Sequence, residues 1–141
     1  MVTFGRIGFF TGEYRHNLTE KNRLSLPKRI RVEVDGDEIV LSKGTDHSIE
    51  GFDKAKWQEM VKTHLTLPFT EEQGKEIRRR VFSSAILAEI DRQGRIVLPE
   101  QMLAHAGLKG KVGEPVVVIG VGDHFELWEE NTWKQKINKE K

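Results

Sequence analysis

Residues 90–99 read IDRQGRIVLP, and residues 18–27 read LTEKNRLSLP. In both stretches apolar residues flank a short polar turn, an arginine follows the turn, and a proline ends the stretch. The same offset separates Arg23 from Arg95 and Pro27 from Pro99. Because self-similarity at a fixed offset indicates a repeated structural unit, the architecture is best interpreted through this repeat.

A second pair of matching blocks follows in the same order. DHSIEGFDKAKW (46–57) is similar to DHFELWEENTW (123–133), with one residue fewer in the second copy. Asp-His, a glutamate, an aromatic residue and a final tryptophan recur in both blocks. Two matched blocks in one order indicate an internal duplication of a strand–turn–strand–helix unit.

The turn of each copy has residues suited to a tight bend. Alternating residues 88–91 predict a half-buried strand before the second turn. Gly94 suits a positive φ, and Asn22 tolerates that region better than most residues. Asp91 can hydrogen-bond the backbone of the turn that follows it, and Thr19 can do so more weakly.

Each turn leads into a short helix and then a strand pair. Pro27 and Pro99 suit the first position of a helix, and the second helix, 99–106, ends at Gly107. The expected strands are 38–42, 48–52, 115–120 and 124–128, with turns that contain Gly44 and Gly122. Between the copies, residues 57–65 predict one helix, and a Thr70–Gln73 capping box opens another.

These elements divide the chain into four segments. They are a first unit at 8–54, connecting helices at 55–83, a second unit at 84–130 and a tail at 131–141. The tail is charged from Lys134 onward, and we expect it to be frayed.

Composition excludes several classes of protein. The chain has no cysteine, which excludes disulfides, thiolate nucleophiles and cysteine-based zinc sites. No apolar run approaches the roughly 20 residues of a membrane helix, and no secretory signal begins the chain, so we expect a cytoplasmic protein without a membrane partner. The net charge is only +1, so any case for nucleic-acid binding depends on where the cations lie.

The two turns each present an arginine, Arg23 or Arg95, directly after a rigid bend. An arginine there can bind phosphate, or guanine through two parallel hydrogen bonds. The alternative is that Arg95 pairs with Asp91 and only locks the turn. Thr19 replaces the acid in the first copy, which favours the binding role there, although Glu20 is a second candidate partner for Arg23.

The first short helix carries Lys28, Arg29 and Arg31, whereas the second carries no cation in Glu100-Gln101-Met102. The first copy is therefore predicted to contribute more to DNA contact, and the alternative is a solvated helix face. Arg78-Arg79-Arg80 point around a helix, which favours an exposed or inter-subunit helix over a phosphate site.

Histidines 47 and 124 each follow an aspartate at matched positions. Both lie in tight connections before a strand, where a polar turn residue needs no catalytic or metal role. No phosphate loop, nucleophile elbow or metal-binding helix pattern is present. We therefore expect no enzyme activity, no catalytic or metal site and no cofactor.

Taken together, these motifs resemble the MraZ family over residues 8–133. The resemblance lies in GEY (12–14), HNL (16–18), K-x-RLSLP (21–27), ID-x-x-GRI-x-x-P (90–99), and Gly120 with DHFELW (123–128). It implies a mixed α+β, β-rich fold of two AbrB-like (SpoVT-AbrB) swapped-hairpin units, forming an interleaved β-barrel core with flanking helices. It also implies a homo-oligomeric ring.

The resemblance further implies a nucleoid-associated transcriptional regulator. Such proteins bind double-stranded DNA at direct repeats upstream of the division and cell-wall gene cluster. The residues expected to contact DNA are Lys21, Arg23, Arg29, Arg31 and Arg95. The first turn, TEKNR (19–23), departs from the family's Asp-x-Lys-Gly-Arg, which changes turn geometry and operator preference. The alternatives are an antitoxin-like AbrB-fold protein, disfavoured by the short tail, and an assembly protein that does not bind DNA.

Overall fold

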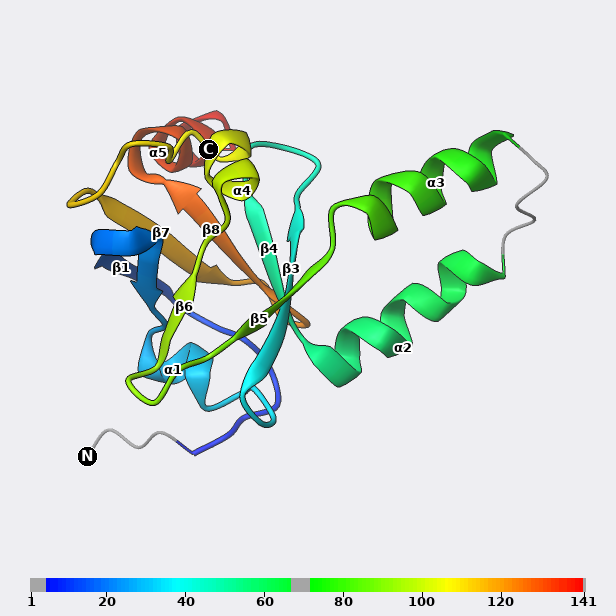
Figure 1. The fold of residues 1–141 in the computed structure, drawn as a ribbon, viewed down its shortest axis with the longest axis horizontal. Helices are drawn as coiled ribbons and strands as arrows, with labels where there is room; N and C mark the ends of the chain where they lie inside the picture. The colour runs from blue at the N-terminus through cyan, green and yellow to red at the C-terminus, as the bar shows by residue number, and fades with distance from the viewer. Residues whose placement is uncertain (1–4, 67–71, 141) are drawn as a thin grey trace.

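The computed structural model describes residues 5–66 and 72–140. These residues form a six-stranded antiparallel sheet in the order β1-β7-β8-β4-β3-β5, a separate ribbon of β2 and β6, and five α-helices (Figure 1). The strands are β1 (Glu13–Asn17), β2 (Arg23–Ser25), β3 (Glu38–Lys43), β4 (Ile49–Asp53), β5 (Ile86–Glu89), β6 (Arg95–Val97), β7 (Pro115–Gly120) and β8 (Phe125–Glu129). The helices are α1 (Lys28–Arg31), α2 (Lys54–Leu65), α3 (Glu72–Ser83), α4 (Glu100–His105) and α5 (Glu130–Lys139), with a short 3₁₀ turn η1 (Glu20–Asn22). The predicted mixed α+β class is confirmed.

Strands from the two repeats pair with each other in both sheets. From the first repeat, β1 pairs with β7, β3 with β5, and β4 with β8, while β2 pairs with β6 in the ribbon. Side chains of both repeats share one buried cluster that includes Leu24, Ile30, Ile96 and Met102. Each repeat depends on the other for part of its backbone hydrogen bonds and for its apolar contacts, so the two fold as one body.

The expected closed β-barrel is not found among the described strands. The large sheet has two unclosed edges, β1 and β5, and β2 and β6 pair with each other outside it. Each ribbon strand has only three residues, bounded by a tight turn on one side and by Pro27 or Pro99 on the other. A proline has no N–H to donate, which limits how far this ribbon extends its ladder.

Both short helices begin one residue later than predicted. Pro27 (ψ 143°) and Pro99 (ψ 152°) are extended N-cap residues, so α1 and α4 start at Lys28 and Glu100. The predicted end of α4 is confirmed, because Gly107 has φ 70° and Leu108 N donates to Leu103 O at 2.8 Å.

Helices α2 and α3 form a hairpin that projects from the sheet, on the opposite side of the molecule from β6 (Figure 1). Trp57 and Phe82 meet edge to face at 5.9 Å, and Arg78 Nη2 donates to the Leu65 carbonyl at 3.0 Å. Arg79 instead faces Glu72 at 3.8 Å, so these neighbouring arginines diverge as predicted. The expected Thr70 cap lies outside the described residues.

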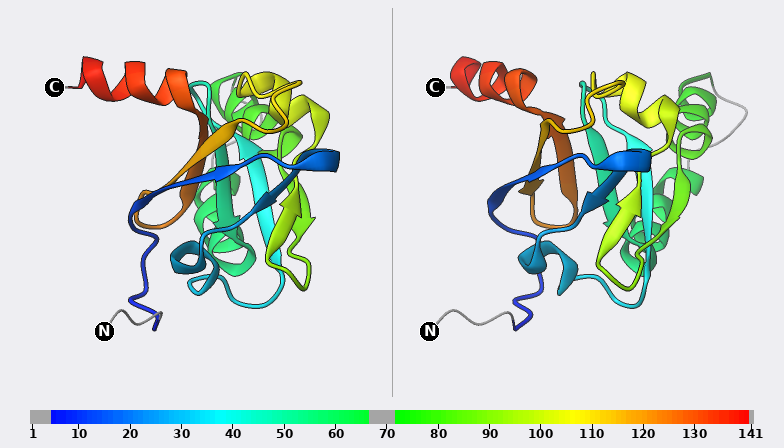
Figure 2. Two further views of the ribbon diagram at one scale, coloured as in Figure 1. Left: turned by 90° about the vertical axis from the view of Figure 1, so that its left-hand side faces the viewer. Right: turned by 60° about the vertical axis from the view of Figure 1, so that its left-hand side comes forward.

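The expectation of a frayed tail from Lys134 onward is wrong for residues 134–139, which belong to α5. Glu129 caps α5 by accepting hydrogen bonds from the Asn131 and Thr132 backbones at 2.9 and 3.0 Å. Trp133 packs against Trp128 at 5.5 Å. Figure 2 shows the helix extending sideways from the end of β8. Across the described residues, no helix is long and apolar enough to span a membrane.

Candidate nucleic-acid interface

The β2–β6 ribbon turns its arginines outward. Leu24 faces Ile96 in the register, and both side chains are buried. Alternation along a strand therefore puts Arg23, Ser25, Arg95 and Val97 on the opposite, outer face. Arg23 is opposite Val97 and Arg95 is opposite Ser25, so the two arginines are diagonal neighbours with Cα atoms about 7–8 Å apart.

In the second turn Arg95 pairs with Asp91, as the alternative interpretation of this arginine predicted. Asp91 Oδ1 accepts hydrogen bonds from the backbones of Gln93 and Arg95, each at 2.9 Å, while Oδ2 pairs with Arg95 Nε at 2.9 Å. These bonds, led by that from the Arg95 backbone, lower the pKa of Asp91. Gly94 has the predicted positive φ, 79°. The ion pair orients the guanidinium, and no described residue pairs with its Nη1 or Nη2 atoms.

The first turn reaches a similar bend by a different route. Lys21 and Asn22 both have positive φ, 63° and 57°, so the sequence pattern identified only one of the two left-handed residues. Thr19 Oγ1 donates to the Arg23 carbonyl at 3.0 Å. This bond reproduces none of the contacts that Asp91 makes with Arg95 and Gln93 in the second turn. Consequently the Arg23 side chain is partly exposed and, within the described residues, has neither an ion pair nor a hydrogen bond.

Hydrogen bonds connect each turn to the strand of the other repeat, so the cations that lie together differ from those that are adjacent in the sequence. Leu26 N donates to the Gly94 carbonyl and Leu98 N to the Asn22 carbonyl, both at 2.9 Å. Each turn therefore lies beside the helix of the other repeat. Local sequence patterns do not signal this exchange, because it depends on pairing between distant strands.

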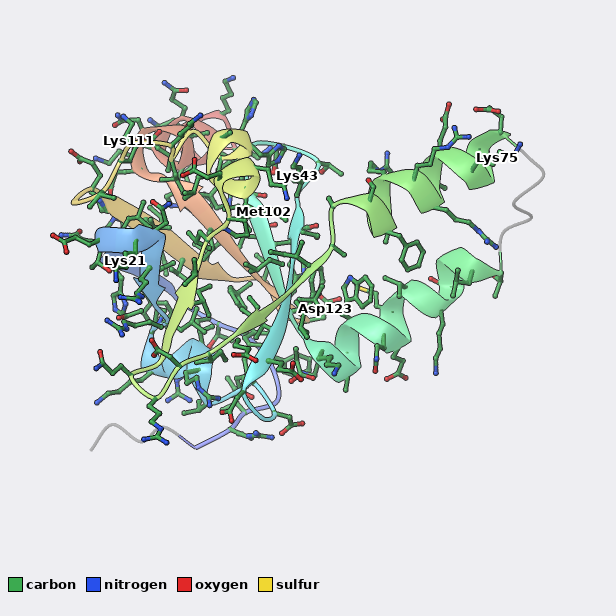
Figure 3. The ribbon with its side chains drawn as sticks, in the orientation of Figure 1. Lys21, Lys43, Lys75, Met102, Lys111 and Asp123 are labelled. Carbon is green, nitrogen blue, oxygen red and sulfur yellow. The ribbon has the colours of Figure 1, made fainter. Side chains whose placement is uncertain are left out.

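One end of the ribbon is more basic than the other as a result. The start of α1, which carries three cations, lies beside the second turn rather than the first, because Leu26 N donates to the Gly94 carbonyl. At the other end, Asn22 Nδ2 lies 3.4 Å from Glu100 Oε1, so acidic α4 borders the first turn. Figure 3 places Lys21 at the outer edge of the molecule, away from the α2–α3 hairpin.

The predicted α1 arginines also have contacts within the chain. Arg29 Nη1 donates to the Gly5 carbonyl at 2.8 Å, and Arg31 Nη2 pairs with Asp37 at 3.0 Å. Both side chains remain partly exposed. The five expected DNA-contacting residues therefore do not form one cluster. They lie in two pairs and one single residue: Arg29 and Arg31 on α1, Arg23 and Arg95 on the ribbon, and Lys21 on the first turn.

Comparison with known proteins gives a consistent family. The sequence model described as "MraZ protein, putative antitoxin-like" matches residues 9–80 and again 81–141. The transcriptional regulator MraZ of Limosilactobacillus fermentum is 35% identical over 88% of this chain and 83% of its own length. Those of Roseiflexus castenholzii and Ligilactobacillus salivarius are 33% and 36% identical, over 92% and 89% of this chain and 87% and 84% of their own lengths.

The two matched segments of the family model divide the chain close to the internal duplication. The relatives cover nearly the whole chain, including both arginine turns. The chain belongs to the MraZ family.

Proposed function

We propose that this chain is a sequence-specific regulator of transcription that binds double-stranded DNA through the outer face of the β2–β6 ribbon. The observation that carries this proposal is the diagonal pair Arg23 and Arg95 on the outer face of a two-stranded ribbon, whose other face is buried. A two-stranded β-ribbon fits the major groove, and arginine is the side chain that most often pairs with guanine there. The names of the relatives, transcriptional regulators, agree with this role.

The two arginines contribute in different ways. Arg95 is held by Asp91 through Nε, so its terminal nitrogens point outward with little entropy left to lose on binding. Arg23 has no such support and becomes ordered only on the DNA. Lys21 binds phosphate beside the first turn, and Arg29 and Arg31 bind phosphate beside the second, which positions the ribbon in the groove.

We propose further that several copies form a ring of AbrB-like swapped-hairpin units that engages direct repeats upstream of the division and cell-wall gene cluster. The exchange of strands between repeats supports the swapped-hairpin assignment. Phe9 and Val121 are 61% and 39% exposed beside the Phe10–Gly122 bridge, an apolar surface suited to contact between copies. Binding by several copies at once offsets the low net charge of each copy. The ring would act in the cytoplasm, in association with the nucleoid.

Fluorescence anisotropy tests the proposal. The full chain is titrated into labelled duplexes with spaced direct repeats from its own promoter region and into scrambled duplexes, across a salt series. We expect tighter binding to the repeats and a log–log salt slope of about −0.9 per neutralised phosphate. Equal affinity for both duplexes would refute sequence-specific binding, and salt-independent binding would refute the phosphate contacts.

The family description also contains the term antitoxin-like, which supports a second candidate function. In that case the same fold would serve mainly to capture a toxin protein. Stable association with a toxin encoded beside the gene, together with loss of repeat-specific DNA binding, would favour this function over the first.

A further inference from the structure

Two glutamates meet where the two repeats join. Glu50 of β4 is directly opposite Glu126 of β8 in the antiparallel register. Both side chains are largely buried, with 28% and 19% exposed. Like charges directly opposite each other destabilise a sheet, so a cation between the two carboxylates would stabilise this pair.

His124 lies against both carboxylates. Its Nε2 is 3.5 Å from Glu50 Oε2 and 3.6 Å from Glu126 Oε2. This buried nitrogen has no hydrogen-bond partner. The ring is stacked on Phe52 at 4.8 Å, which fixes its plane. A buried nitrogen that points between two carboxylates without bonding to either has the arrangement expected of a metal ligand.

The distances from His124 Nε2 to the two carboxylates match a tetrahedral metal site. Zinc binds imidazole nitrogen and carboxylate oxygen at about 2.0–2.2 Å, which puts neighbouring tetrahedral ligands about 3.3–3.6 Å apart. The two Nε2–Oε2 distances, 3.5 and 3.6 Å, lie within that range. All three candidate ligand atoms lie within 4.8 Å of one another.

Each candidate ligand is also oriented through its other polar atom. Asp123 Oδ1 lies 2.7 Å from His124 Nδ1, Trp128 Nε1 donates to Glu126 Oε1 at 2.9 Å, and Ser42 Oγ lies 3.4 Å from Glu50 Oε1. A carboxylate on the second imidazole nitrogen is the usual outer shell of a zinc-bound histidine. The three contacts leave Nε2 and two Oε2 atoms facing one point.

We propose that Glu50, His124 and Glu126 bind one Zn²⁺ ion per chain, and that this ion clamps the first repeat to the second. One ligand comes from β4 and two come from β8 and its preceding turn, so the ion bridges the junction. Glu50 and His124 also line a cavity of about 220 Å³ beneath the α2–α3 hairpin, from which water can supply a fourth ligand. Figure 3 places Asp123 at this junction, near the start of α2.

The duplicated position in the first repeat does not form an equivalent site. His47 matches His124 in sequence, yet it is exposed and its ring lies 6.2 Å from that of His105. Spacing along the chain gave no reason to expect a metal role for either histidine. The proposal depends instead on β4–β8 pairing, which brings Glu50 of one repeat to Glu126 of the other.

A protonated imidazole is the competing cation. Burial lowers the pKa of His124, but Glu126, Glu50 and Asp123 raise it more, to about 10. The metal-free cluster therefore holds an imidazolium, and Zn²⁺ binding would displace the proton from His124 Nε2 into solvent. Direct metal titration distinguishes the two states.

Isothermal titration calorimetry on the untagged, chelator-treated full chain is the test, with ZnCl₂ as titrant. We expect saturation at one Zn²⁺ per chain, and visible absorption of tetrahedral intensity when Co²⁺ is used instead. His124→Asn and Glu126→Gln are each expected to weaken binding by about 100-fold or more, and Asp123→Asn by about 10–100-fold.

His47→Asn is the matched control and is expected to retain wild-type affinity. Far-ultraviolet circular dichroism checks that each variant is folded, and Glu50→Gln provides a ligand variant on the other repeat. Absence of saturable binding to the wild-type chain would overturn the proposal and leave the imidazolium as the cation. Unchanged affinity in folded His124→Asn, or loss of affinity in His47→Asn, would overturn the assigned ligands.

Discussion

Replacing Arg23 with alanine is expected to weaken binding to the direct repeats while leaving the fold intact. Arg23 is partly exposed and, among the described residues, has no ion pair or hydrogen bond to lose. A surface substitution of this kind changes the free energy of unfolding by no more than about 0.5 kcal/mol. Any loss of DNA affinity therefore reports contact with DNA rather than unfolding.

The size of the loss follows from the contact that the ribbon geometry allows. One bidentate arginine–guanine pair contributes about 1–3 kcal/mol of discrimination, which corresponds to roughly 5- to 150-fold in affinity per contact. If Arg23 also neutralises a phosphate, the magnitude of the salt slope falls by about 0.9. Fluorescence anisotropy on one labelled repeat at several salt concentrations measures both quantities.

Two further variants separate the possible contacts. Arg23→Lys keeps the charge but loses the planar fork, so it should bind almost as weakly as Arg23→Ala if guanine is the target. Lys139→Ala removes an equal charge from the end of α5 and should bind normally. Wild-type affinity in a folded Arg23→Ala variant would refute the role given to the ribbon.

Three other substitutions test the structure around the interface. The folded chain lowers the pKa of Asp91, so this carboxylate stabilises the fold fully above its unfolded pKa of about 3.9. The stabilisation is lost as the pH falls through the folded pKa. Asp91→Asn should therefore remove this part of the acid dependence of thermal unfolding. A Cβ at Gly51 would collide with the buried ring of Phe125, so Gly51→Ala should lower stability by about 1–3 kcal/mol in chemical denaturation. Trp133→Ala removes the contact with Trp128 and should speed amide exchange in α5.

Each of these predictions has a result that would contradict it. They are an unchanged acid limb in Asp91→Asn, wild-type stability in Gly51→Ala, and unchanged exchange of the α5 amides in Trp133→Ala. The folded state of each variant is checked by circular dichroism at neutral pH.

The sequence predicted the local structure well where a single residue type determines the backbone. Gly94 and Gly107 have the positive φ that their positions indicated. The strand pairs 38–42 with 48–52 and 115–120 with 124–128 are present within a residue of the predicted bounds. Alternation, turn residues and glycine act over a few residues, so one sequence contains this information.

Features that depend on strand exchange could not be predicted in the same way. The sequence grouped α1 with the first turn, whereas hydrogen bonds from Leu26 and Leu98 place each turn beside the other repeat's helix. The cluster of Glu50, His124 and Glu126 likewise forms only through the register of β4 with β8. The basic end of the ribbon combines α1 of the first repeat with the turn of the second repeat. The expectation that the first repeat contributes more to DNA contact therefore stays a prediction.

Footprinting with dimethyl sulfate tests the central claim most directly, because this reagent methylates guanine N7 in the major groove and adenine N3 in the minor groove. The bound wild-type chain should protect guanine N7 within each direct repeat, and Arg23→Lys should lose part of that protection. Protection of adenine N3 alone, or no protection of guanine at saturating protein, would contradict major-groove binding by the β2–β6 ribbon.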